Sequence, residues 1–167
     1  NRLYLNSGSG TFGSGSDVSA DAHATRSLEL DDVDADGDLD LVVGNAGQAN
    51  RLYRNDGSGG FDPASDITSD LHATTSLALG DVDGDGDRDL VVGNGGQANR
   101  LYRNDGNGLF GPGANISGDA QVTQSVALGD VDGDGDLDLV AGNSGDANRL
   151  YLNDGTGSFG AGTNVTA

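Results

Sequence analysis

One nine-residue pattern, DVDxDGDxD, occurs three times in the chain, and each copy starts 49 residues after the previous one. The copies cover residues 32–40, 81–89 and 130–138. This exact period constrains the fold more than any other feature, because repeats of roughly 40–50 residues are typical of propellers, solenoids and arrays. The chain should therefore be built from one structural unit used several times.

The alternating aspartates of each copy predict a cation site. If the backbone curls, several carboxylates point toward one centre, and two like charges about 4 Å apart repel by roughly 4 kcal/mol at an effective dielectric near 20. A hard cation with oxygen ligands would remove that repulsion. The candidate metal residues are Asp32, Asp34, Asp36, Asp38, Asp40, Asp81, Asp83, Asp85, Asp87, Asp89, Asp130, Asp132, Asp134, Asp136 and Asp138.

Calcium fits these loops better than magnesium, because it accepts six to eight oxygens in a flexible shell. The first positions match the calcium loop of an EF-hand, with Gly86 at the sixth position of the middle copy. An EF-hand needs a Glu at position twelve, where this chain has Val43, Val92 and Ala141. The expected ligands are therefore the side chains at positions one, three, five and nine and the carbonyl at position seven. A solvated acidic turn is the alternative.

Composition is consistent with a fold that depends on metal. Leu, Ile, Val and Phe make up 36 of 167 residues, and the net charge is −19, which is near the range of chains that stay disordered without a cofactor. Fifteen of the 27 acidic residues lie in the three loops, so three bound Ca²⁺ ions would change the formal charge from −19 to −13. The remaining negative charge disfavours nucleic acid and anionic membranes as partners.

Other compositional signals are weaker. The chain has no cysteine, so disulfides say nothing about its compartment. No apolar stretch approaches the length of a membrane span, and we expect no membrane insertion. The sequence starts with Asn1 and not with Met, and we expect it to be a mature or excised segment with no signal peptide before Asn1.

Four short strands are expected in each unit, with turn chemistry between them. In the middle unit they comprise residues 76–79, 89–92 and 100–103, followed by a fourth that opens at Phe110 and runs toward residues 115–117. Asn104, Asp105 and Gly106 supply the turn of a hairpin. No segment has helical periodicity, so the predicted fold class is all-β, with blades of four antiparallel strands.

The strings DVDGDGDLDLVAGN and NRLYRNDGxGxF resemble the FG-GAP and VCBS-type repeats, the blade unit of integrin-α-like β-propellers. The resemblance covers all 167 residues, and Phe12-Gly13, Phe110-Gly111 and Phe159-Gly160 keep the family's Phe-Gly pair, whereas Phe61-Asp62 departs from it. The resemblance implies that the aspartate loop joins the first two strands of each blade, binds calcium and is chiefly structural.

Counting blades predicts three complete ones and part of a fourth. Complete blades are expected at residues 25–69, 74–118 and 123–167, and residues 1–20 are expected to form the outer half of a preceding blade. About three and a half blades cannot close a ring, since closed propellers usually have four to eight. Either the chain is a segment of a longer repeat protein, or copies associate head to tail into a ring or filament.

Other candidate residues have simpler explanations. His23 and His72 occupy equivalent positions, but the third unit has Gln121 there, so an ordinary loop role is favoured over metal binding or catalysis. The regular tyrosines and phenylalanines could form sugar platforms, but interblade packing is simpler. The regular arginines are expected to pair with neighbouring acids or carbonyls. The residues in question are Tyr4, Tyr53, Tyr102, Tyr151, Phe12, Phe61, Phe110, Phe159, Arg2, Arg51, Arg100 and Arg149.

Two further features concern modification and catalysis. Asn115 and Asn164 begin sequons for N-glycosylation, where earlier units have Asp17 and Asp66. Residues that break the repeat are the better place to search for an active site, and they form no recognisable acid–base pair. These residues are Arg26, Glu29, Asp31 and Arg88.

The function expected from the sequence is a non-enzymatic module, outside the cell or on its surface, in which calcium stiffens each blade for adhesion or for surface or filament assembly. Its protein or glycan ligand is unknown. The alternatives are a carbohydrate-binding lectin and a non-catalytic appendage of a larger secreted enzyme.

Overall fold

The computed structural model describes residues 1–165, and over these residues the chain forms fourteen strands and no helix. A two-stranded sheet, called the half-blade below, consists of β1 (Arg2–Leu3) and β2 (Ser16–Asp17). The first blade consists of β3 (Thr25–Asp31), β4 (Asp40–Asn45), β5 (Arg51–Tyr53) and β6 (Ser65–Asp66). The second consists of β7 (Thr74–Gly80), β8 (Asp89–Asn94), β9 (Arg100–Tyr102) and β10 (Ala114–Asn115). The third consists of β11 (Thr123–Gly129), β12 (Asp138–Asn143), β13 (Arg149–Tyr151) and β14 (Thr163–Asn164).

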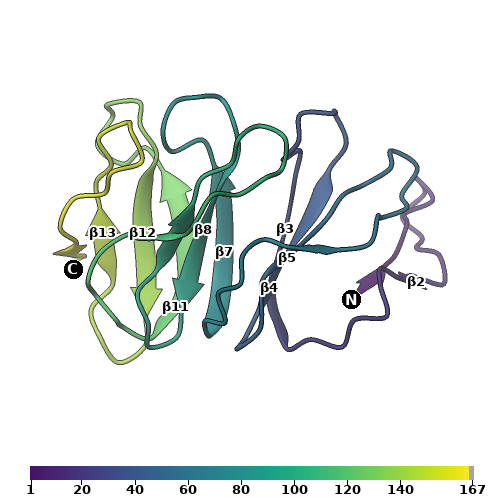
Figure 1. The fold of residues 1–167 in the computed structure, drawn as a ribbon, viewed down its shortest axis with the longest axis horizontal. Helices are drawn as coiled ribbons and strands as arrows, with labels where there is room; N and C mark the ends of the chain where they lie inside the picture. Colours follow the sequence, from purple (N-terminus) through teal and green to yellow (C-terminus); the bar gives the residue numbers. More distant parts are fainter. Residues whose placement is uncertain (166–167) are drawn as a thin grey trace.

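Each blade is a meander in which consecutive strands pair antiparallel. The sheets stand side by side in chain order, and the first strands of neighbouring blades contact each other (Figure 1). This confirms the predicted all-β architecture of four-stranded antiparallel blades with a 49-residue repeat. No helix in the described part of the chain is long and apolar enough to cross a membrane.

The second strands of the first two blades, β4 and β8, are buried along their whole length, which explains their continuous apolar runs, whereas Val140 of β12 is only half-buried at the end of the row. In β8, Leu90 and Val92 pack with residues of the first blade, whereas Val91 packs with residues of the third. Each interface between blades is therefore a separate small core. The blades stabilise one another and not only themselves.

The predicted fourth strand was too long. In the second unit β10 is limited to Ala114–Asn115, and Phe110 forms an isolated bridge with Asn104. Pro112 lies between them and has no N–H to donate to a ladder. The Gly111 N–H instead donates to the carbonyl of Arg103, 2.7 Å away, and closes the turn.

The predicted first three strands are confirmed, with small shifts at their ends. The first extends to Thr74–Gly80 and includes an irregularity in register between Thr74 and Ser76. The third ends at Tyr102, one residue earlier than expected.

The two ends of the row expose surfaces that are buried between internal blades. Leu28 of β3 is 49% exposed, whereas the equivalent Leu77 of β7 packs on a preceding blade and is 2% exposed. Val131 after β11 is 53% exposed, whereas the equivalent Val82 is covered by the third blade and is 1% exposed. The same apolar side chain is thus core or surface according to its neighbour.

Candidate metal sites

Each acidic loop joins the first two strands of its blade, and glycine allows it to curl tightly. Gly37, Gly86 and Gly135, at the sixth position, have φ of 95°, 96° and 99°, a region that residues with a Cβ rarely adopt. The fourth position is also left-handed, with glycine in two loops and Ala35 in the first, where φ is 61°. All three loops therefore use glycine at the sixth position, whereas the first loop adopts the left-handed conformation at the fourth position with an alanine.

The curl gathers three carboxylates at one point in every loop. One carboxylate oxygen from each residue of a group lies within 4.8 Å of the others. The groups are Asp32, Asp34 and Asp36; Asp81, Asp83 and Asp85; and Asp130, Asp132 and Asp138. The first two groups use positions one, three and five, and the third uses positions one, three and nine.

Several of these oxygens are buried without a hydrogen-bond donor. Within the described residues, Oδ1 of Asp32, Asp34 and Asp83 has no partner. A buried carboxylate oxygen without a donor is unfavourable, and a hard cation would satisfy it. Burial raises the pKa of Asp83, and the nearby Asp85 carboxylate raises it further. The first two loops therefore fit a divalent cation with oxygen ligands.

The ninth position links each loop to the rest of its blade. Asp89 is fully buried, and its two oxygens accept hydrogen bonds from the Val82 N–H at 3.2 Å and the Asn104 N–H at 2.9 Å. Asp40 and Asp138 make the equivalent bonds. Burial raises the pKa of Asp89 to about 6. Position nine thus braces the loop, and in the third loop it also joins the carboxylate group.

The seventh-position side chains point elsewhere. Asp38, Asp87 and Asp136 are in none of the carboxylate groups found among the described residues. A Cβ built on Gly106 would lie 2.6 Å from Oδ2 of Asp87, so this side chain lies against the turn of its own blade. Equivalent contacts hold at Gly57 and Gly155. Only the carbonyl at this position is left as a possible ligand.

Two arginines that the sequence reasoning missed lie beside the loops. Arg54 Nε is 3.0 Å from Asp34 Oδ2, and Arg103 Nε is 3.2 Å from Asp83 Oδ2. A signal was present in the aligned repeats, because NRLYRN in two units replaces NRLYLN in the others. A change of residue type at one repeated position indicates a local difference between blades that are otherwise equivalent in sequence.

Tyr102 and Tyr151 pack in the cores between blades and the regular arginines pair with neighbouring acids, as predicted, although Tyr4 of the half-blade is 50% exposed. In the second blade the Tyr102 hydroxyl donates to Asp70 Oδ2 at 2.9 Å, and Arg100 pairs with the same carboxylate at 3.1 Å. The set Tyr151, Arg149 and Asp119 repeats this arrangement in the third blade. Each blade thereby holds the linker that precedes its first strand.

The other residues singled out in the sequence lie in separate parts of the fold. His23 and His72 belong to no metal-ligating group in the described part of the chain. Arg88 pairs with Asp31 of the preceding blade at 3.2 Å. Asn115 is exposed, and its Oδ1 accepts a hydrogen bond from Arg100. Asn164 is exposed too, but its sequon ends at Thr166, outside the described residues.

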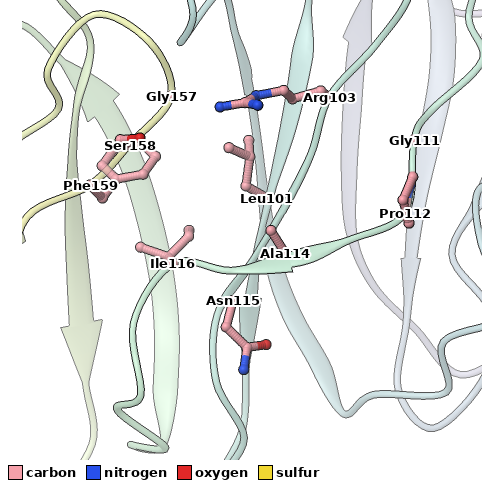
Figure 2. A pocket seen from close by; sticks show the side chains of 10 residues that line it. All are labelled: Leu101, Arg103, Gly111, Pro112, Ala114, Asn115, Ile116, Gly157, Ser158 and Phe159. Carbon is pink, nitrogen blue, oxygen red and sulfur yellow. The ribbon is translucent and has the colours of Figure 1, made fainter.

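A cleft of about 510 Å³ lies between the second and third blades. Figure 2 shows Leu101, Ile116 and Phe159 around it, with Arg103 and Asn115 at opposite ends. The equivalent cleft between the first and second blades is only about 100 Å³. One difference is the residue before the phenylalanine, which is Ser158 in the larger cleft and Leu109 in the smaller.

Comparisons with known proteins point to one kind of repeat. A family model described as an FG-GAP-like repeat matches residues 32–92, 81–141 and 130–167. No curated protein matches the sequence.

One solved structure shows the same kind of fold. A lectin of Agrocybe aegerita, from a structural study of its specific recognition of non-reducing terminal N-acetylglucosamine, is similar with a TM-score of 0.69 and 23% identity. The match covers 98% of this chain and 46% of the lectin, so the chain spans less than half of its length. The Photorhabdus luminescens Tc holotoxin pore matches with a TM-score of 0.43 and 19% identity, over 96% of this chain and 10% of that one, and supports no inference.

Proposed function

Because the chain belongs to the FG-GAP-like repeat family, we propose that it is a calcium-binding module that acts outside the cell and catalyses no reaction. Its repeats form propeller blades, and each complete blade carries one acidic loop. The observation that carries the proposal is the convergence of three carboxylates within 4.8 Å in every loop. Such a group at neutral pH needs a counter-cation close by.

Calcium is the preferred cation for chemical reasons. The candidate ligands are all oxygens, and the carbonyl at position seven can complete a flexible shell. Extracellular calcium modules commonly have dissociation constants of about 10⁻⁴ to 10⁻³ M. Sites of that strength would be nearly empty at cytosolic calcium levels, which supports an extracellular or cell-surface location.

The role of the ion is to stabilise the blades. If each site is held at ten times its dissociation constant, binding adds about 1.4 kcal/mol per site to the folded state. The carboxylates that repel one another in the metal-free loop become ligands of one centre. The rigid blades then present their outer surfaces for adhesion or assembly.

The direct test is calorimetric calcium titration together with thermal melting in calcium and in excess chelator. We expect three bound ions and a melting temperature that falls sharply in chelator. Asp85→Asn should remove or weaken one site, whereas Asp146→Asn, an exposed acid outside the loops, should leave the titration unchanged. Identical melting with and without chelator would contradict the proposal.

A second candidate function is glycan binding in the cleft between the second and third blades. Its volume, its apolar wall with Phe159 and its polar ends suit a sugar, because ligand sites are mostly apolar with a few placed polar groups. The similar Agrocybe aegerita lectin recognises N-acetylglucosamine. A glycan array with wild type and Ser158→Leu, which should narrow the cleft, tests this idea. Binding that the substitution does not reduce would count against this cleft.

A further inference from the structure

Two arginines connect an acidic loop with the blade that follows it. Arg54, just after β5, pairs with Asp34 of its own blade, and its Nη2 donates to the carbonyl of Asn107 in the second blade at 2.8 Å. Arg103 pairs with Asp83, and its Nη2 donates to the carbonyl of Thr156 in the third blade. Each guanidinium thus bridges a candidate metal ligand and a turn 53 residues later in the chain.

The turns that contain Asn107 and Thr156 have a glycine next to the bridging guanidinium. Gly108 and Gly157 both have φ of 70°, and a Cβ on either would lie 2.8 Å from Nη2 of the bridging arginine. Any larger residue would push the guanidinium away. The carbonyl, the glycine and the arginine therefore form one fitted junction, present at both internal interfaces.

The half-blade and the third blade have leucine at the position of the bridging arginine. The residue equivalent to Arg54 and Arg103 is Leu5 in the half-blade and Leu152 in the third blade. A Cβ built on Gly59, the equivalent of Gly108, would lie 3.8 Å from Leu5 Cδ2, and the leucine has no polar atom to form a bridge. Leu152 is 43% exposed. Within residues 1–165, both bridges lie where an acidic loop is followed by another blade.

The bridged carboxylates face in two directions. Oδ2 of Asp34 and of Asp83 contacts the arginine, whereas Oδ1 is buried and has no donor among the described residues. Oδ1 is thus left for a cation while Oδ2 holds the guanidinium. Residues behind a metal ligand commonly orient it in this way.

A second contact reinforces the link. Asn104 donates from Nδ2 to the carbonyl of Val33, the second residue of the first loop, at 2.7 Å, and Asn153 does the same to Val82. Both contacts are buried. The first two loops are therefore each connected to the next blade at two points.

We infer that Arg54 and Arg103 are positioning residues that couple cation binding in the first two loops to docking of the following blade, and that the third loop is uncoupled. A cation that fixes Oδ1 also fixes Oδ2, which orients the guanidinium and so the turn of the next blade. This inference rests on the proposed calcium function. It separates the first two loops, which are coupled to a following blade, from the third loop, which is not.

Hydrogen exchange with and without calcium tests the coupling turn by turn. In wild type, calcium should slow exchange about fivefold or more in residues 105–109 and 154–158, which lie outside the loops. Arg54→Leu, which uses the residue found at positions 5 and 152, should reduce the effect in 105–109, where the Asn104 contact with Val33 remains, and leave it in 154–158. Arg103→Leu should do the reverse, so each variant is the control for the other.

Two more variants complete the design. Arg54→Lys keeps the charge but a single ammonium cannot span both partners, so the calcium effect at 105–109 should again fall; if it stays at the wild-type level, the bridging geometry is wrong. Leu152→Arg, with no following blade in this chain, should change neither turn. If the loops respond to calcium but both turns respond equally in wild type and both leucine variants, the inference fails and the proposed function stands. If calcium slows exchange nowhere, including residues 32–40, both fail.

Discussion

Backbone conformation at single residues sets how readily each acidic loop forms. The fourth loop position is left-handed in all three copies, with Gly84 at φ 78°, Gly133 at φ 84° and Ala35 at φ 61°. A residue with a Cβ is disfavoured by roughly 1–2 kcal/mol in this region. The first loop is therefore the most strained of the three at this position.

Replacing that alanine should relieve the strain. We expect Ala35→Gly to stabilise the protein by about 0.5–1 kcal/mol, because the relief exceeds the entropy that glycine adds to the unfolded chain. Urea unfolding of wild type and variant measures the change. Gly84→Ala is the matched control and should be destabilising by a similar amount, and a neutral result for both would refute the strain.

Titration of one buried aspartate should make the metal-free protein sensitive to pH. Burial raises the pKa of Asp89 to about 6 in the folded chain from 3.8. Because the folded state binds the Asp89 proton more tightly than the unfolded state, protonation of Asp89 stabilises the fold below about pH 4. This stabilisation is lost as pH rises through about 6. In chelator, wild type should lose more stability than Asp89→Asn between those values.

The comparison with Asp89→Asn isolates that carboxylate. Asp21, Asp56 and Asp154 have lowered pKa values and act in the opposite direction, but they do so equally in both proteins. Urea unfolding midpoints measured across this pH range give the pH dependence of stability for each protein. Parallel slopes for the two proteins would show that Asp89 titrates normally.

At the scale of the element, the second strand of each blade carries the most packing. Leu90 of β8 is fully buried between blades, and Leu90→Ala should cost about 2–5 kcal/mol of stability through lost burial and a residual cavity. Leu71→Ala, at a residue 65% exposed in the linker before β7, should cost less than about 0.5 kcal/mol. Equal losses in chemical denaturation would contradict the packing.

Strand prediction succeeded where the pattern is local and failed where it is not. The apolar run from Leu90 to Val92 and the glycines around it identify a strand without knowledge of its neighbours. The fourth strand was overestimated because Phe110 has a strand-like character that Pro112 and the turn contacts override. A two-residue strand such as β10 has no period that a sequence could reveal.

For the whole molecule, the exposed ends bear on assembly. Leu28 at one end and Val131 at the other are equivalent to residues that are buried at internal interfaces, so the two faces are complementary by repetition. The half-blade already covers part of the first face through Val18, which packs on the core of the first blade. The half-blade nevertheless leaves Leu28 exposed, so part of this face is free to contact another copy.

Sedimentation in calcium across a range of concentrations tests head-to-tail association. We expect dimers or larger species that Leu28→Asp dissociates, because a stable interface needs on the order of 1,000 Å² of buried surface and a charge at its centre is unfavourable. Leu71→Asp, which is also exposed but lies outside the end faces, is the control. A compact calcium-loaded monomer at every concentration would exclude the assembly.

The sequence alone determined the repeat, the all-β blades and the clustering of aspartates, because these depend on residues close together in the chain. Only the tertiary structure decided which carboxylate oxygens lack donors, which brace the backbone and which face an arginine. It also decided that Val82 is core and Val131 surface, although their loops are nearly identical. The physical reason is that burial depends on the neighbouring blade, about 49 residues away, and that the braces and arginine pairs join residues of different strands, which a local sequence pattern does not determine.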